Sequence, residues 1–156
     1  MMYLWGLLCS GHAVDRDTNN LSVFNTIEEL QATVLTPVPA AEAGGGLPVP
    51  FELVTLWRRS NAMVGESSRC RFQVTFEEAP EIVRYTQSIE VDLMAFERAR
   101  VVAAVGGVPL PNFEPAMWNV WFTPQQDHDG TWANVGIPIP LKLTVNAQDA
   151  PPPTDG

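Results

Sequence analysis

The chain has 156 residues, 46% of them hydrophobic and 17% charged, which suits one domain with a sizeable core and argues against global disorder. Eighteen acidic residues against nine basic ones give a formal net charge of −9, which disfavours nucleic acid and anionic membrane surfaces as partners. Fourteen prolines and eleven glycines leave little room for long helices, whereas short strands joined by turns fit between them.

The first apolar segment, residues 3–9, predicts a β-strand that is buried on both faces or lies at the centre of a sheet. A secretory signal would carry Lys or Arg before a longer apolar run, and a membrane-spanning helix would need about 20 apolar residues. We therefore expect a cytoplasmic protein with no membrane partner.

A turn rich in Asp and Asn at residues 15–20 follows the first strand. Apolar and polar residues then alternate over 21–34, which predicts a strand that forms a hairpin with the first. Residues 26–29 also fit a helix capping box, which is a competing signal. Because Val34 and Pro37 favour extended chain and an early end, we expect a strand there.

Residues 36–50 hold four prolines and three consecutive glycines, which predicts a long loop. Such a loop serves either as a crossover between two sheets or as a mobile binding loop. Long surface loops are often tolerated insertions, so we favour the crossover.

The middle of the chain carries the most regular strand signals. Residues 51–58 alternate, and residues 69–76 follow a strict period of two, with apolar side chains on one face and polar ones on the other. A turn at 77–80 leads to a further strand within 83–93. A strand with one apolar face is typical of an antiparallel sheet that has one face in water.

Residues 93–105 begin with helix-forming residues but continue with valines. We expect a bend followed by a strand that carries Arg98 and Arg100 on its polar side.

The last third predicts a hairpin with strands at 117–122 and 132–135 and a connecting turn at 125–130, where Asp-Gly is the sharpest signal. Pro138 and Pro140 then permit only an edge position or a switch between sheets.

A final strand over 141–145 precedes residues 147–156, which we expect to be a disordered, proline-rich tail. We count roughly seven to nine strands at the spacing typical of sandwiches and barrels. The sequence therefore predicts one all-β domain at residues 1–146. We expect an antiparallel two-sheet sandwich, immunoglobulin-like or C2-like.

Cysteines and histidines are too few for a disulfide framework or a zinc site. Cys9 and Cys70 lie in apolar runs and suit buried core positions, and a single bridge between them remains an alternative. Neither His12 nor His128 has a second ligand at metal-binding spacing. Since the sequence also lacks a nucleophile elbow and a phosphate-binding loop, we expect neither a cofactor nor an enzyme.

The turn after the first strand opens like an EF-hand calcium loop. The pattern then fails, because Asn20 stands where Gly is required and Thr26 where a bidentate Glu should close the shell. A hairpin turn explains the same residues. Aspartates of the later turn would join such a site if both turns lay at one end of the sandwich. The candidate calcium ligands are Asp15, Asp17, Asn19, Asp127 and Asp129.

Tryptophans supply the candidate contacts to a partner. Trp57 and Trp118 fall in phase with apolar neighbours and predict core positions, whereas Trp121 falls out of phase and Trp132 directly follows a turn. An outward Trp either stacks on a sugar or anchors a protein partner, although it is more often covered. The candidate partner-binding residues are Trp121, Trp132, Arg98 and Arg100.

Short motifs are spread along most of the chain up to about Val145: Leu7-Leu8-Cys9, Asn20 to Asn25, Ile27-Glu28-Glu29, Trp57-Arg58-Arg59, Arg98-Ala99-Arg100, Gly107 to Pro111, and Trp132 with Ile137 to Leu141. In these motifs the sequence resembles a family of small bacterial proteins of unknown function. The resemblance implies a single β-sandwich domain and carries over no functional residue.

The leading hypothesis from the sequence is a non-enzymatic module that binds or assembles with a protein partner, including a second copy of itself. The alternative is a module that binds carbohydrate or, with calcium, another small ligand.

Overall fold

We describe a computed structural model of the chain, which covers residues 1–15, 17, 20–36, 46–61, 63–110, 112 and 114–149. All regular elements in these residues are β-strands, so the predicted all-β class is confirmed, but there are twelve strands rather than seven to nine. They are β1 (Met2–Val14), β2 (Leu21–Thr26), β3 (Glu29–Thr36), β4 (Gly46–Leu47), β5 (Phe51–Arg58), β6 (Ser67–Phe76), β7 (Tyr85–Asp92), β8 (Arg98–Val105), β9 (Val108–Pro109), β10 (Ala116–His128), β11 (Thr131–Asn134) and β12 (Ile139–Asp149).

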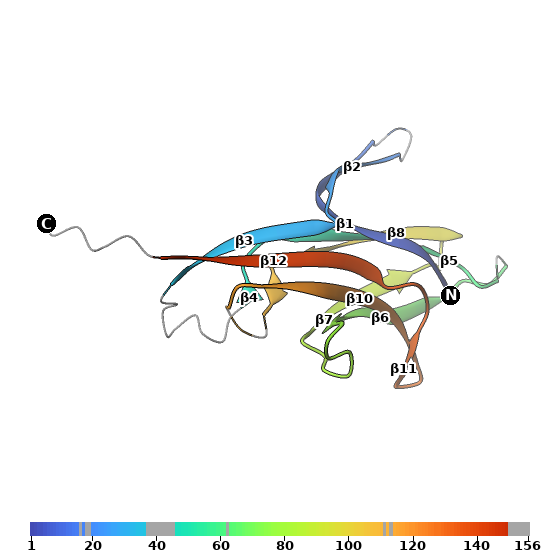
Figure 1. Ribbon diagram of the computed structural model, residues 1–156. Helices are drawn as coiled ribbons and strands as arrows, with labels where there is room; N and C mark the ends of the chain where they lie inside the picture. The colour runs from blue at the N-terminus through green and yellow to red at the C-terminus, as the bar shows by residue number, and fades with distance from the viewer. Residues whose placement is uncertain are drawn as a thin grey trace, which may run out of the picture.

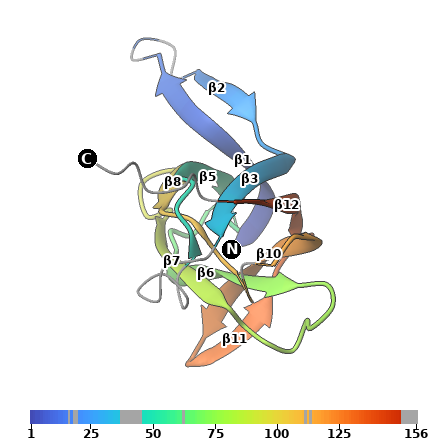
Figure 2. The ribbon, with the colours of Figure 1, turned by 60° about the vertical axis from the view of Figure 1, so that its left-hand side comes forward.

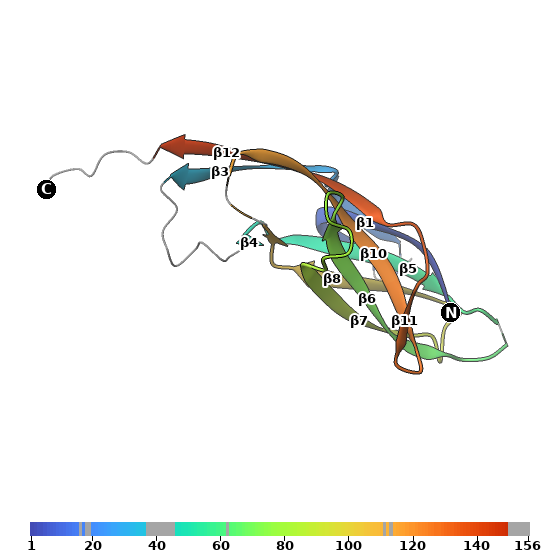
Figure 3. The ribbon, with the colours of Figure 1, turned by 60° about the horizontal axis from the view of Figure 1, so that its bottom comes forward.

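The strands form two large sheets and one small one (Figure 1). The four-stranded sheet has the order β2-β1-β5-β8. The six-stranded sheet has the order β3-β12-β10-β6-β7, with β11 paired to β10, and β4 pairs with β9. The expectation of a purely antiparallel arrangement is wrong at one place, because β3 runs parallel to β12, as Figure 3 also shows.

The period-two pattern of β6 fixes which face of the six-stranded sheet is buried. Cys70, Phe72 and Val74 are at most 1% exposed, whereas the alternate residues Arg69 and Arg71 lie on the outer face. The predicted division of this strand into an apolar and a polar side is therefore confirmed.

Side chains from both large sheets share one hydrophobic core. Trp57 of β5 and Phe72 of β6 are fully buried, and the ring of Tyr3 meets both edge-to-face, at centroid distances of 5.2 Å and 6.0 Å. Phe51 and Phe122 make a further edge contact at 5.9 Å between the two sheets. Aromatic pairs of this geometry add to the stabilisation from burial alone.

Residues 27 and 28 take the chain from one sheet to the other. The N–H of Ile27 donates to the carbonyl oxygen of Leu8 at 2.8 Å in the four-stranded sheet, while the carbonyl of Glu28 accepts from the N–H of Lys142 at 2.9 Å in the other. The single strand expected over 21–34 is therefore two strands, β2 and β3. The capping-box signal produces no helix, since these backbone groups are already paired between strands.

The β1–β2 hairpin forms an arm that rises from the body of the molecule (Figures 1 and 2); its described residues are 10–15, 17 and 20–26. The first part of β1, from Met2 to Cys9, pairs with β5, whereas its last residues pair with β2 alone. The predicted hairpin of these two segments is confirmed.

Two boundaries near the end of the chain differ from the sequence expectation. The strand β10 continues through Gln125 to His128, so the turn is only Asp129-Gly130, both with positive φ. The expected turn at 125–130 is too long because Gln125 pairs with strands on both sides, β6 and β11.

The strand β12 also continues to Asp149 beside β3, so residues 147–149 belong to the sheet rather than to the expected tail. Residues 150–156 lie outside the described residues, as do 37–45 of the expected loop. Pro140 sits within β12 opposite Trp121, before the first β3 pair at Lys142, where β12 has no second neighbour that would need its N–H.

No helix in the part of the chain described above has the length and apolar character needed to cross a membrane.

Thr55 links the core to the backbone, which generates a stability prediction. Its buried hydroxyl accepts from the indole N–H of Trp57 at 2.9 Å and donates to the carbonyl of Val101 at 3.2 Å. Thr55→Val leaves the Trp57 donor buried without a partner, so it should lower the free energy of unfolding by about 1–3 kcal/mol in chemical denaturation. Thr55→Ser keeps the hydroxyl and should retain more stability than Thr55→Val; equal losses would contradict the assignment.

Candidate binding groove on the four-stranded sheet

The four-stranded sheet is apolar on its outer face as well as on the face that meets the core. Cross-strand pairs place Trp5 beside Leu56, and Leu7 beside Val54. Val54 and Cys9 are fully buried, yet they lie outside the main core cluster. A sheet with one face in water should alternate between apolar and polar residues, so this second apolar face requires an explanation.

A groove of about 930 Å³ lies on this outer face. Strands β1, β5 and β8 supply its floor, the β1–β2 arm supplies one wall, and the segment before β8 contributes Phe96. The lining residues are Trp5, Leu7, Val14, Leu21, Val23, Leu56, Phe96, Arg98, Ala99, Arg100 and Val102.

Exposed apolar groups mark this groove as an open surface. Phe96 is 69% exposed, Val14 44% and Trp5 38%. At the base of the arm, His12 Nδ1 lies 2.7 Å from a carboxylate oxygen of Glu52 on β5, which ties the arm to the sheet. The arm wall is therefore attached to the floor by a side-chain contact as well as by backbone pairing.

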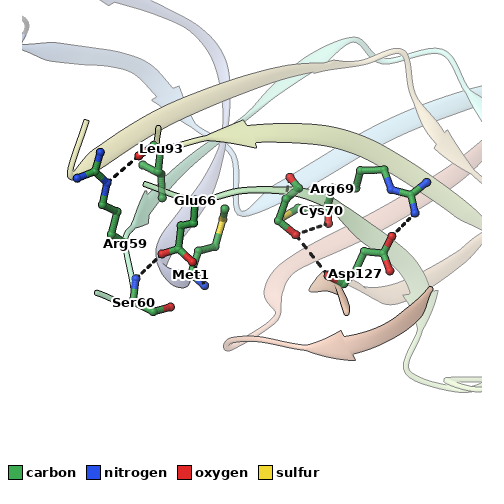
Figure 4. Close-up of polar contacts among 9 residues, drawn as sticks. Met1, Arg59, Ser60, Glu66, Arg69, Cys70, Leu93 and Asp127 are labelled. Atoms are coloured by element: carbon green, nitrogen blue, oxygen red, sulfur yellow. Dashed lines mark hydrogen bonds and ion pairs between the residues drawn. The ribbon is translucent and has the colours of Figure 1, made fainter. Parts of the chain in front are cut away.

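The segment that carries Phe96 is held by Arg59. Its guanidinium donates to the carbonyl oxygens of Leu93 at 2.7 Å and Met94 at 2.6 Å, and its backbone N–H donates to the carbonyl of Glu97 at 2.9 Å. Figure 4 shows Arg59 reaching the Leu93 carbonyl. Arg59 thus helps to hold, through its side chain and its backbone, the turn that places Phe96 and the start of β8 at the rim of the groove.

Arginines stand at one end of the outer face. Arg58 of β5 and Arg98 of β8 are directly opposed in the antiparallel register, and Arg100 follows two residues later on the same face. The guanidinium groups of Arg58 and Arg98 make no hydrogen bond or ion pair with another described residue. Like charges placed directly opposite each other on neighbouring strands are destabilising.

The structure separates the four predicted partner-binding residues. Arg98 and Arg100 line the groove as described, on the outer side of β8, where their neighbours are largely apolar, whereas the sequence predicted a polar side. Trp121 and Trp132 instead lie on the other sheet, on β10 and β11. Trp132 is opposite Asp127 of β10. Asp127 lies six residues after Trp121, so the two tryptophans are about 20 Å apart along the strand direction.

The outer face of the six-stranded sheet holds a closed polar network around Gln125, which is 7% exposed. Its amide nitrogen donates to Gln73 at 3.0 Å and to Asn134 at 2.8 Å, and its oxygen accepts from Arg71 at 2.8 Å. The Arg71 guanidinium also lies over the Trp132 ring, 4.2 Å from its centroid. These groups satisfy one another, and the arginine covers one of the two ring faces on which a sugar could stack.

The candidate calcium ligands fall into two turns that lie far apart. Asp15 and Asp17 sit at the tip of the arm, while Asp127 and Asp129 belong to the β10–β11 hairpin at the opposite side of the molecule (Figures 1 and 2). Asp127 is already paired with Arg69 and accepts from the N–H of Gly130 at 2.7 Å. Asn19 lies outside the described residues, and within them no three His, Cys, Asp or Glu side chains gather at metal-binding distance.

Both cysteines are free thiols, Cys9 on β1 and Cys70 on β6, so the alternative of a bridge is not realised. Burial raises the pKa of the Cys70 thiol to about 12, and it also raises the pKa of the Cys9 thiol. Thiols of this kind are poor nucleophiles at neutral pH.

Sequence reasoning missed the apolar part of the groove. It predicted that residues 3–9 are a strand buried on both faces or at the centre of a sheet. The strand β1 does lie between β2 and β5, but Trp5 and Leu7 face an open groove. The available signal was that β1 and β5 both carry apolar residues at consecutive positions. Two neighbouring strands that are apolar on both faces indicate either a sheet covered on both sides by the protein itself or a sheet face on which a partner docks.

A scan against models of known protein families gives no match to this chain, and a search of curated proteins finds no related sequence.

Glu66 contacts three segments of the chain near the turn that holds Phe96. These segments contain Met1, Ser60 and Leu93. Its carboxylate lies 2.8 Å from the Met1 amino group and accepts from the N–H of Ser60, and its carbonyl accepts from the N–H of Leu93 at 2.8 Å (Figure 4). Burial alone raises the pKa of this carboxyl, but the contacts with Met1 and Ser60 together hold the pKa below its usual value.

A lowered pKa in the folded state means that ionised Glu66 stabilises the fold above the unfolded-state pKa, and that this contribution is lost as pH falls through the folded pKa. Glu66→Gln should therefore cost about 1 kcal/mol of unfolding free energy at pH 7, with a smaller difference from wild type below pH ~4. Urea unfolding across this pH range measures the difference. The exposed Glu81→Gln is the control, and a difference that does not shrink in acid would contradict the assignment.

The Gln125 network predicts a third effect on stability. Gln125→Ala removes the partner of Arg71 in a site of low exposure, so it should lower the free energy of unfolding by about 1–3 kcal/mol. Gln31→Ala, on the exposed surface of β3, should change it by less than about 0.5 kcal/mol. Thermal or denaturant unfolding compares them, and a Gln125→Ala loss no larger than that of the control would show that the network contributes nothing.

Proposed function

We propose that the two large sheets form a sandwich of the immunoglobulin-like rather than the C2-like kind. The order β12-β10-β6-β7 supports this proposal, because it follows the G-F-C-C′ order of immunoglobulin variable-type domains. The neighbours β1, β5 and β8 follow the order A-B-E of the opposing sheet, and β3 lies beside β12 as an additional edge strand.

We propose that the domain is a non-enzymatic module that binds a protein partner through the groove on the four-stranded sheet. The observation that carries the proposal is the apolar outer face of this sheet, with exposed Trp5 and Phe96 and half-buried Leu56 in one groove. Contiguous apolar surface rimmed by charged residues is typical of protein-binding sites. Tryptophan and arginine, both present here, are the residues most enriched at the energetic centre of interfaces.

The composition of the groove supports binding rather than chemistry. Its described lining is apolar apart from Arg98 and Arg100. A guanidinium remains protonated at neutral pH, so it can hold an anionic group but cannot act there as a general base.

The proposal predicts that binding depends on the apolar floor. Affinity purification from cells that make the protein, followed by mass spectrometry, should recover a partner with wild type, and Trp5→Ser or Leu56→Ser should each weaken its retention by about tenfold or more. Met117→Ser is the matched control, because Met117 is 61% exposed on the other sheet. Melting temperatures establish that the variants fold.

If Trp5→Ser and Leu56→Ser retain the partner as well as Met117→Ser does, the binding surface lies elsewhere and the proposal is overturned. A wild-type protein that stays monomeric and recovers no partner would also overturn it.

A further inference from the structure

We infer that the groove takes an extended peptide segment of a partner protein, with apolar side chains over the floor and a carboxylate held by Arg58 and Arg98. This inference rests on the proposed function and names the chemistry of its ligand.

The charge arrangement at the groove end points to an anion. Arg58 and Arg98 face each other across neighbouring strands, with Arg100 beside them on the same face. The chain has 18 acidic residues against nine basic ones, yet no described acidic residue pairs with either Arg58 or Arg98. A carboxylate between two guanidinium groups would remove their repulsion and accept charge-assisted hydrogen bonds from both.

The shape of the groove favours an extended segment. The strand β8 is an edge of the four-stranded sheet, paired only with β5 among the described strands. Ala99 packs against the core but also lines the groove, so the groove reaches the backbone of this edge strand. An extended peptide along β8 places alternate side chains on the outer face, in line with Arg98 and Val102.

The apolar requirement comes from the other lining residues. Leu56 and Trp5 lie between the arginine end and the arm, and the arm adds Val14 and Val23 as a wall. A bound peptide with only acidic side chains would leave these apolar residues exposed to water. The complementary sequence therefore combines β-branched or aromatic residues with Asp, Glu or a free C-terminal carboxylate at one end.

A second copy of the chain is the less favoured occupant. Two molecules that each carry a net charge of −9 repel each other, whereas a partner segment needs only one local carboxylate. Sedimentation of the wild-type protein, described below, tests for self-association.

The probe is a displayed library of random peptides selected on the purified full chain, with affinities of the enriched peptides measured by fluorescence anisotropy. We expect enriched peptides to combine apolar residues with a carboxylate. Arg98→Ala and Arg58→Ala should each weaken binding by roughly tenfold or more, and salt should weaken wild-type binding more than variant binding. Arg84→Ala, an exposed arginine outside the groove, should stay within about twofold.

A paired substitution separates the carboxylate contact from a general loss of structure. Replacing the peptide Asp or Glu by its amide should weaken binding to wild type, and should add little further loss with Arg98→Ala. Additive losses would show that the two groups do not meet and would overturn the inference.

Three further outcomes distinguish this inference from the proposed function. Apolar peptides that need Trp5 but not Arg98 would overturn the inference and leave the binding groove in place. Peptides insensitive to Trp5→Ser, Arg58→Ala and Arg98→Ala would overturn both. Sedimentation that shows wild-type dimers and monomeric Trp5→Ser would identify a second copy as the occupant and overturn the inference.

Discussion

Burial of apolar side chains between the four-stranded and six-stranded sheets is the interaction on which the structure depends. Trp57, Phe72 and Phe122 are fully or almost fully buried in one shared cluster, and the ring of Tyr3 contacts a residue from each sheet. Because this contact uses one face of each sheet, it also decides which residues remain outside. The arginines of β8 and the glutamine network of β10 are positioned as a consequence of how the core is filled.

The two outer faces that result have opposite characters. On the six-stranded sheet, Arg71, Gln125 and Trp132 contact one another, so the face is polar and its groups are satisfied. On the four-stranded sheet, Trp5 and Leu56 lie in an open groove. A protein that is stabilised by one core gains nothing from a second apolar face left in water, so such a face is typical of a surface that a partner covers.

Alternation within one strand and the pairing of strands that follow each other in a hairpin were readable from the sequence, whereas pairing between strands far apart in the chain was not. The faces of β6 and the outward position of Arg98 follow from local period two. The change of sheet at residues 27–28 depends on hydrogen bonds to Leu8 and Lys142, far away in sequence. Likewise Gln125 resembles a turn residue, and only its bonds to neighbouring strands make it a buried strand residue.

The parallel pairing of β3 with β12 has a consequence for biosynthesis. Glu29 is opposite Lys142, so an early strand takes its only neighbour in the sheet from the last strand of the described chain. During translation β3 therefore has no strand to pair with, and its backbone groups stay hydrated, until every other described strand has left the ribosome. Completion of the six-stranded sheet is then a late event in the maturation of the polypeptide.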